Sequence, residues 1–147
     1  MYAKILVPLD GSDRAERILP HAEELARQMG STLLFLQVVE PVYDLVGPEG
    51  TIIDVGRDLV EKRIEEAGEY VRRLASEFNE RGLKANGLVE TGPVVAAIHM
   101  VADREGVDLI TMASHGRSGL ARVFYGSVAI GMLNRIDRPL LLIRAEG

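Results

Sequence analysis

Residues Thr32–Val39 read TLLFLQVV, a nearly continuous apolar run without the alternation of a strand that has one solvated face. Such a run is typical of a strand covered on both faces, as in a parallel sheet. A weaker run, Leu83–Val89, contains Asn86 and Gly87 and is expected to be an edge strand. Further short aliphatic runs, each predicting a buried strand, lie at Ala3–Leu9, Leu109–Ala113 and Leu140–Ile143.

Amphipathic helices are predicted between these runs. Ser12 or Asp13 can cap the first helix, with Glu16 in a capping-box position after Asp13 and Gly30 as its end. Pro93 suits the first position of a third helix, and a fourth is predicted from about Ser127 to Ile136. The inward faces of the first, second and third helices are predicted to be Ala15, Ile18, Ala22, Leu25 and Met29; Val60, Ile64, Ala67, Val71, Leu74 and Phe78; and Val94, Ala97, Ile98 and Val101.

This alternation of strands and helices predicts one α/β domain over residues 1–147, a doubly wound five-stranded parallel sheet with helices on both faces. Strand orders 2-1-3-4-5 and 3-2-1-4-5 are both open, and the second suits a weak third strand at the edge. In that order a ligand crevice is expected where strands 1 and 4 lie side by side, at their carboxyl ends.

Composition excludes several classes of function. Acidic residues outnumber basic ones by 22 to 17, a net charge of −5, which argues against nucleic acid or a membrane as partner. The chain has no cysteine, and its three histidines (His21, His99 and His115) have no ligand-like spacing, so no confident metal site is expected. His21 and His99 are expected at the surface or its boundary, and His115 is not expected to be catalytic. No apolar run is long enough for a signal peptide or membrane span, so the protein is expected to be cytoplasmic.

The most informative segment is Met112–Ala129, MASHGRSGLARVFYGSVA. Gly116, Gly126 and the start of a helix at Ser127 could form an anion site from main-chain N–H groups, with Arg117 adding positive charge. The Ser127 hydroxyl could bind phosphate or Mg²⁺. On the glycines alone, an ordinary turn and helix cap remain equally open. Neither a P-loop nor a G-x-G-x-x-G fingerprint is present.

Together with KILVPLDGS (Lys4–Ser12), VVEP (Val38–Pro41) and RPLLLIR (Arg138–Arg144), this segment resembles the universal stress protein family over the whole chain. The resemblance implies strand order 3-2-1-4-5 and binding of ATP, or of ADP or AMP, with Mg²⁺ or Mn²⁺. It also implies a homodimer through the last strand, Arg138–Arg144, acting on an unknown protein partner in a stress response.

The family's ATP pattern G-x2-G-x9-G-S/T falls on Ala113, Gly116, Gly126 and Ser127, with alanine in place of the first glycine. If that glycine needs positive φ or close approach to ribose, the methyl group would clash. The nucleotide-binding positions implied by the resemblance are Pro8, Leu9, Asp10, Val38, Met112, Ala113, Gly116, Arg117, Gly126, Ser127 and Val128.

Two functions follow. The first is a nucleotide-responsive regulatory dimer, with at most slow ATP hydrolysis because one carboxylate, Asp10, lacks the cationic clamp of phosphoryl transfer. The second, favoured by Ala113, is a nucleotide-independent dimeric interaction module. A hydrolase would need a glycine-serine loop after strand 1, which DGSDRAE matches poorly. The segment Glu40–Thr51 is either a functional flap or a surface excursion.

Overall fold

The computed structural model describes residues 1–41, 45–46, 52–53, 56–115 and 127–145. Its main sheet is parallel and has the order β5-β2-β1-β6-β7, which is 3-2-1-4-5 when these strands are numbered along the chain. The alternative order 2-1-3-4-5 is therefore wrong. The strands are β1 (Lys4–Leu9), β2 (Thr32–Val39), β5 (Lys84–Thr91), β6 (Leu109–His115) and β7 (Leu140–Ala145).

Within Glu40–Thr51, the structure describes residues 40–41 and a two-residue strand, β3 (Leu45–Val46). This strand pairs antiparallel with β4 (Ile52–Ile53). The other residues of that segment lie outside the described part of the chain, so both interpretations of it stand as predictions.

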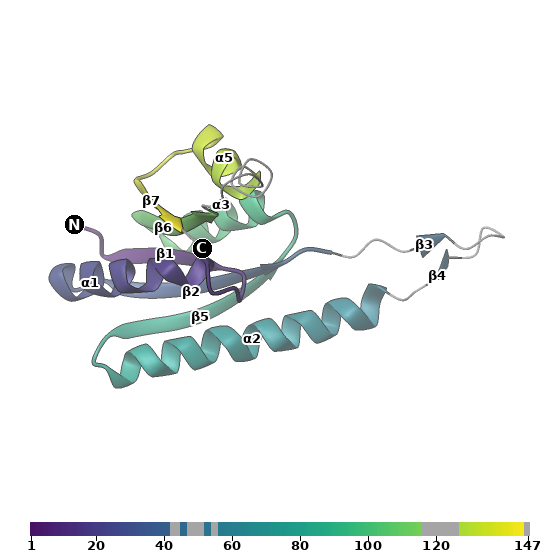
Figure 1. The fold of residues 1–147 in the computed structure, drawn as a ribbon, viewed down its shortest axis with the longest axis horizontal. Helices are drawn as coiled ribbons and strands as arrows, with labels where there is room; N and C mark the ends of the chain where they lie inside the picture. The colour runs from purple at the N-terminus through teal and green to yellow at the C-terminus, as the bar shows by residue number, and fades with distance from the viewer. Residues whose placement is uncertain (42–44, 47–51, 54–55, 116–126, 146–147) are drawn as a thin grey trace.

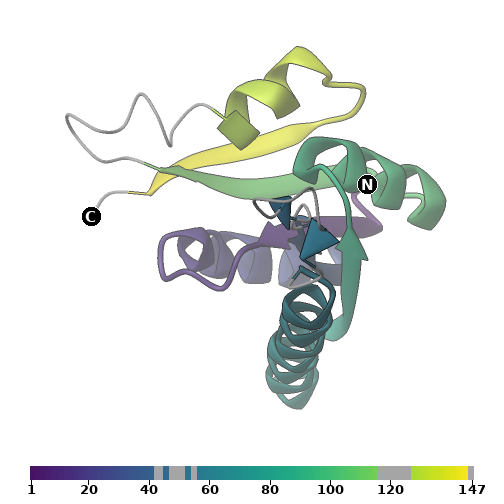
Figure 2. The ribbon, with the colours of Figure 1, turned by 90° about the vertical axis from the view of Figure 1, so that its right-hand side faces the viewer.

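Among the described residues, two helices cover each face of the sheet, as the alternation of strands and helices predicted (Figures 1 and 2). Helices α1 (Leu19–Met29) and α2 (Gly56–Glu80) pack over Ile5 and Val7 of β1, whereas α3 (Val94–Glu105) and α5 (Ser127–Asn134) pack over Leu6. Successive residues of β1 thus enter opposite cores, which explains the continuous apolar runs.

The first predicted helix is split in two. It starts as a 3₁₀ turn, η1 (Ala15–Ile18), and the Ser12 hydroxyl caps it by accepting a 3.2 Å hydrogen bond from the Ala15 N–H. Pro20 has no N–H to donate to the Glu16 carbonyl, which accepts from Leu19 instead in a tighter turn.

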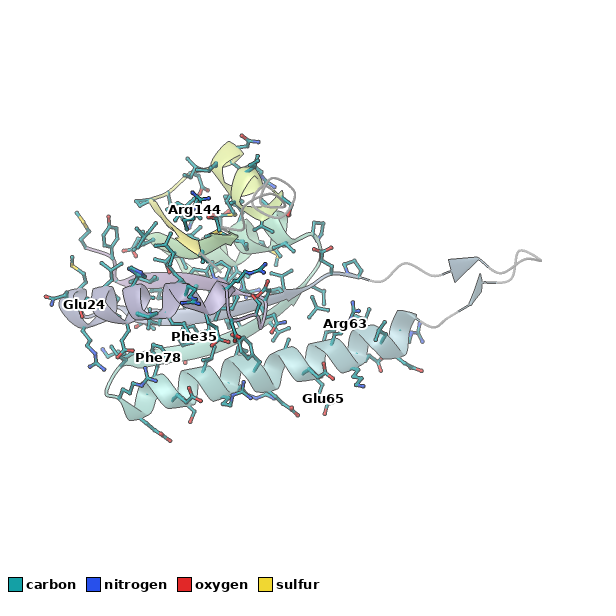
Figure 3. The ribbon with its side chains drawn as sticks, viewed as in Figure 1. Glu24, Phe35, Arg63, Glu65, Phe78 and Arg144 are labelled. Carbon is teal, nitrogen blue, oxygen red and sulfur yellow. The ribbon has the colours of Figure 1, made fainter. Side chains whose placement is uncertain are left out.

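Helix α2 lies close against the edge strand β5. The Phe78 ring meets Phe35 of β2 edge-on, with 5.0 Å between centroids (Figure 3). A Cβ atom on Gly87 of β5 would lie 2.7 Å from the main-chain carbonyl of Val71. Gly87 therefore does more than weaken a strand, because it lets the helix approach the sheet.

Some boundaries and burials differ from the prediction. Pro93 is the N-cap of α3 and not its first residue, and α5 ends at Asn134 instead of Ile136. Met29, predicted inward, is 46% exposed because it lies in the last turn of α1. His99, predicted at the surface or boundary, is only 7% exposed, with its Nδ1 3.7 Å from Asp137 Oδ1. No helix in the described ranges is long and apolar enough to span a membrane.

Candidate functional site

A cavity of about 140 Å³ lies at the carboxyl ends of β1 and β6. This is where the strand order reverses, the place at which doubly wound sheets bind ligands. The chain leaving β1 forms one wall, and the first turns of α3 and α5 form others. The lining residues are Pro8, Leu9, Asp10, Arg14, Ala15, Val94, Ile98, Met112, Ala113, Ser114, Ser127, Val128 and Ala129.

The structure brings together most of the predicted site residues that it describes. Seven of them line the cavity, namely Pro8, Leu9, Asp10, Met112, Ala113, Ser127 and Val128. Gly116, Arg117 and Gly126 lie outside the described residues, so their role stays a prediction.

Val38 lines a different hollow, a groove of about 420 Å³ between the ends of β1 and β2 and helix α2. Arg63 and Tyr70 are among the α2 residues on its other side, and Figure 3 shows Arg63 on that helix. Asp10 lines both the groove and the cavity. The two hollows therefore share Asp10 as a lining residue.

Sequence reasoning missed Arg14, which lies in the β1–η1 loop. Ala15, the first residue of η1, was predicted only as a core residue of the first helix, and Ser114 lies in β6 next to the predicted Ala113. Val94 and Ile98 were predicted only as core residues of α3. They pack in the core and also line the cavity, since the inner face of the first turns of α3 borders it. A prediction of which residues face the core cannot say which of them border an opening.

Asp10 is held by the loop that follows it. Its Oδ1 accepts a 2.9 Å hydrogen bond from the Ser12 N–H, an Asx turn that orients the carboxylate at the end of β1. The same Ser12 caps η1 through its hydroxyl. Within the described part of the chain Oδ2 of Asp10 has no hydrogen-bond partner, so one oxygen is available to a ligand's hydroxyl or amine.

Ala113 has the backbone of a strand residue. It belongs to β6 and pairs with Ile143 of β7. Among the described non-glycine residues, Tyr2 alone has a positive φ, of 56°. The Ala113 main chain is thus compatible with an L side chain, and the remaining question is whether its methyl group in the cavity wall leaves room for a ligand.

The Val38 carbonyl lies where the β1–β2 ladder ends. Leu9 and Gln37 are the last pair of that ladder, and the Val39 carbonyl accepts a 3.2 Å hydrogen bond from Gly92 N–H on the β5 side. Successive residues of a strand direct their main-chain groups to opposite neighbours. The Val38 carbonyl therefore points to the β1 side, beyond the last pair, where it is an acceptor at the rim of the groove.

Ser127 and Val128, which line the cavity, are the first two residues of α5. Main-chain N–H groups in the first turn of a helix lack intrahelical partners and favour an anion. No group of three or more acidic, histidine or cysteine side chains in the described ranges could hold a metal ion.

Tyr70 links the groove to the 3₁₀ turn. Its hydroxyl donates a 2.7 Å hydrogen bond to Glu16 Oε2. Burial raises the pKa of Tyr70, and the neighbouring Glu16 carboxylate raises it further. The tyrosine therefore remains a neutral donor throughout the physiological range.

Comparison with known proteins gives a family and several structural relatives. The sequence profile of the universal stress protein family matches residues 1–144. Universal stress protein MJ0577 of Methanocaldococcus jannaschii is 27% identical, aligned over 99% of this chain and 97% of its own. The solved structure of MJ0577 has a TM-score of 0.80, with 100% of this chain and 99% of that one covered.

Two further solved structures contain adenine nucleotides. A universal stress protein of Archaeoglobus fulgidus in complex with dAMP has a TM-score of 0.61 at 25% identity, covering 97% of this chain and 98% of that one. A universal stress protein in complex with cAMP has a TM-score of 0.65 at 20% identity, covering 99% and 98%. At 20% identity the second likeness shows the fold alone.

Proposed function

Because the chain belongs to the universal stress protein family, we propose that it binds an adenine nucleotide across the groove and the cavity and acts as a nucleotide-responsive dimer. The observation that carries the proposal is the position of Asp10, which lines both hollows. Val38 lines only the groove, and Ser127 only the cavity. An elongated ligand with a base at one end and an anion at the other matches this order.

The groove supplies the base contact. The Val38 carbonyl accepts a hydrogen bond, which matches the exocyclic amine of adenine and not the O6 of guanine. Beside it, the free oxygen of Asp10 accepts from a ribose hydroxyl. The cavity alone is smaller than the roughly 300–1,000 Å³ of ordinary ligand pockets, so a whole nucleotide needs both hollows.

The cavity supplies the phosphate contact. The Ser127 hydroxyl and the first N–H groups of α5 donate to phosphate oxygens, and the predicted Gly116, Arg117 and Gly126 would complete this end. Mg²⁺ or Mn²⁺ would arrive with the phosphates and neutralise part of their charge. Ser127 is the residue proposed to bind the metal ion, through its hydroxyl oxygen.

The dimer would form at β7. This strand pairs only with β6 in the described sheet, and its Leu140–Ile143 side chains are half-buried. An apolar edge with open main-chain groups invites pairing with a second copy about a two-fold axis. Leu140 and Leu142 of β7 pack into the same core as Met132 of α5. A nucleotide bound at the start of α5 would therefore contact a helix that packs against the proposed dimer strand.

A nucleotide-independent interaction module is the second candidate. Ala113 favours it, since its methyl group occupies cavity wall that glycine would leave open. In that case the β7 edge, and not the cavity, would carry the function.

Calorimetric titration of nucleotide-stripped protein with ATP and Mg²⁺ tests the two candidates, with Ala113→Gly alongside and GTP as the control ligand. We expect micromolar ATP binding by the native chain and GTP binding at least about 10-fold weaker. Binding by Ala113→Gly alone would identify the methyl group as a block and favour the interaction module. If neither protein binds ATP, the whole proposed site is wrong.

A further inference from the structure

Arg14 is the single cationic side chain among the described residues that line the cavity. It was not among the residues implied by the family pattern. It lies in the loop after β1, four residues beyond Asp10, and shares the cavity wall with Ser127 of α5. A cation and a helix N-terminus thus border one small space.

The backbone around Arg14 is fixed. Its φ and ψ of −66° and −46° are helical, and its carbonyl accepts a 3.1 Å hydrogen bond from Arg17 N–H. Ser12, two residues earlier, caps the same turn and holds Asp10. The position from which the Arg14 side chain leaves the main chain is therefore set by the same turn that orients Asp10.

The Arg14 side chain has no protein partner in the described part of the chain. It is half-buried, yet no ion pair or hydrogen bond joins its guanidinium to another described residue. Asp10 is the carboxylate in the same wall, and no ion pair or hydrogen bond joins it to Arg14. A partly desolvated guanidinium without an anion is unfavourable, and a ligand anion in the cavity would relieve it.

From this placement we infer that Arg14 binds a phosphate group of the ligand, so that the site selects phosphorylated adenine nucleotides over adenosine. This inference rests on the proposed function and adds a residue to it. The guanidinium presents a planar set of N–H donors that matches two phosphate oxygens at once. Ser127 and the first N–H groups of α5 would contact the same phosphate, while Asp10 would contact the ribose.

The test compares ligands that share adenosine and differ in phosphate. Native protein, Arg14→Gln and Arg14→Lys are titrated with ATP, AMP and adenosine in the presence of Mg²⁺. Arg17→Gln is the matched control, because Arg17 lies in the same turn but borders a different surface hollow. Thermal unfolding of each variant checks that it is folded.

We expect Arg14→Gln to weaken ATP and AMP by about 10- to 100-fold and to leave adenosine within about twofold. Arg14→Lys should keep part of the phosphate affinity, and Arg17→Gln should behave as the native chain. Equal loss for all three ligands would overturn the inference in favour of a structural role, as would no loss for any of them. If Arg14→Gln does not fold, the decision passes to Arg14→Lys: a loss of at least about threefold for ATP and AMP but not adenosine supports the inference, and any other pattern overturns it.

If native protein binds ATP but Arg14→Gln does so equally well, Arg14 has no phosphate role while the proposed function stands. If native protein binds none of the three ligands, the proposed function itself is wrong, and the role of Arg14 falls with it. The two failures are therefore distinguishable in one series of titrations.

Discussion

The Tyr70 hydroxyl donates a 2.7 Å hydrogen bond to the Glu16 carboxylate, which ties helix α2 to the 3₁₀ turn that follows β1. The same turn holds Asp10 through Ser12. One side of the groove is thereby fastened to the loop that borders the cavity. The strength of this link is open to direct measurement, because the tyrosine titrates at alkaline pH.

Tyr70→Phe should lower the free energy of unfolding at pH 7 by about 1 to 2 kcal/mol, since a hydrogen bond to a charged acceptor is lost. The native protein should also lose stability as pH rises above the ordinary tyrosine pKa of about 10. The pKa of Tyr70 is raised by burial and by Glu16, so above that pH the unfolded chain releases its proton first. Chemical denaturation at pH 7, 9 and 10.5 measures both effects.

Tyr2→Phe is the matched control for this experiment, because no hydrogen bond of the Tyr2 hydroxyl occurs in the described structure. Tyr2→Phe should lose stability with rising alkaline pH as steeply as the native protein does, whereas Tyr70→Phe should lose less stability over the same pH range. Equal slopes for native protein and Tyr70→Phe would show that the Glu16 link does not persist in solution.

The strands were predictable because each is buried on both faces, which leaves a nearly continuous apolar run. The edge position of β5 followed from Asn86 and Gly87. The burial of His99 did not follow, because its side chain meets residues distant in the sequence, such as Asp137, 38 residues further along the chain. The break between η1 and α1 could have been read from Pro20, whose missing N–H ends the first turn.

The candidate site was predictable where it depends on the ends of β1 and β6. The cavity-lining residues Leu9, Asp10 and Ala113 follow from the rule that ligands bind at the switch point, whereas Pro8 and Met112 were predicted from the resemblance to the family. Arg14 and Val94 were missed, because their positions depend on how the η1 turn and the first turn of α3 lie over the sheet. That geometry is set by packing between helices and sheet and leaves no periodic signal in the sequence.

Gly87→Ala should destabilise the protein by about 1 to 3 kcal/mol, as overpacking does. The added Cβ would meet the Val71 main chain at 2.7 Å, and neither α2 nor β5 can move without disturbing its other contacts. Gly68→Ala is the control, since its Cβ would meet only the mobile end of Arg72 and alanine favours a helix. Urea denaturation should place Gly68→Ala at or above native stability, and equal losses in the two variants would contradict this account.

Arg138 fastens the start of β7 to the end of α3. Its guanidinium, 14% exposed, donates to both oxygens of Asp137, to Asp103 and to the Val107 carbonyl. Arg138→Met should lower the free energy of unfolding by about 2 to 3 kcal/mol because these charge-assisted bonds are lost. Arg104→Met, which removes a side chain 45% exposed, should change it by less than about 1 kcal/mol.

Acid should weaken the same contact. The hydrogen bond from Arg138 holds the pKa of Asp137 below its usual range, so its contribution is complete above about pH 5 and is lost as pH falls further. Arg138→Met should therefore show a shallower loss of stability between pH 5 and 3 than native protein does. If Arg138→Met and native protein lost stability equally between pH 5 and 3, the ion pair of Arg138 and Asp137 would not contribute to stability.

Leu142→Pro should convert the proposed dimer into a monomer. The Pro139 carbonyl accepts a 3.0 Å hydrogen bond from Ile110 N–H of β6, so alternate residues of β7 face β6 and the Leu142 N–H faces the open edge. Proline at such a position removes a donor to a second copy while leaving the β6–β7 ladder intact. Leu142→Ala is the control, because it shortens the side chain and keeps the N–H. Sedimentation equilibrium should then give a dimer for native protein and Leu142→Ala and a folded monomer for Leu142→Pro, whereas a dimer in all three would place the interface elsewhere.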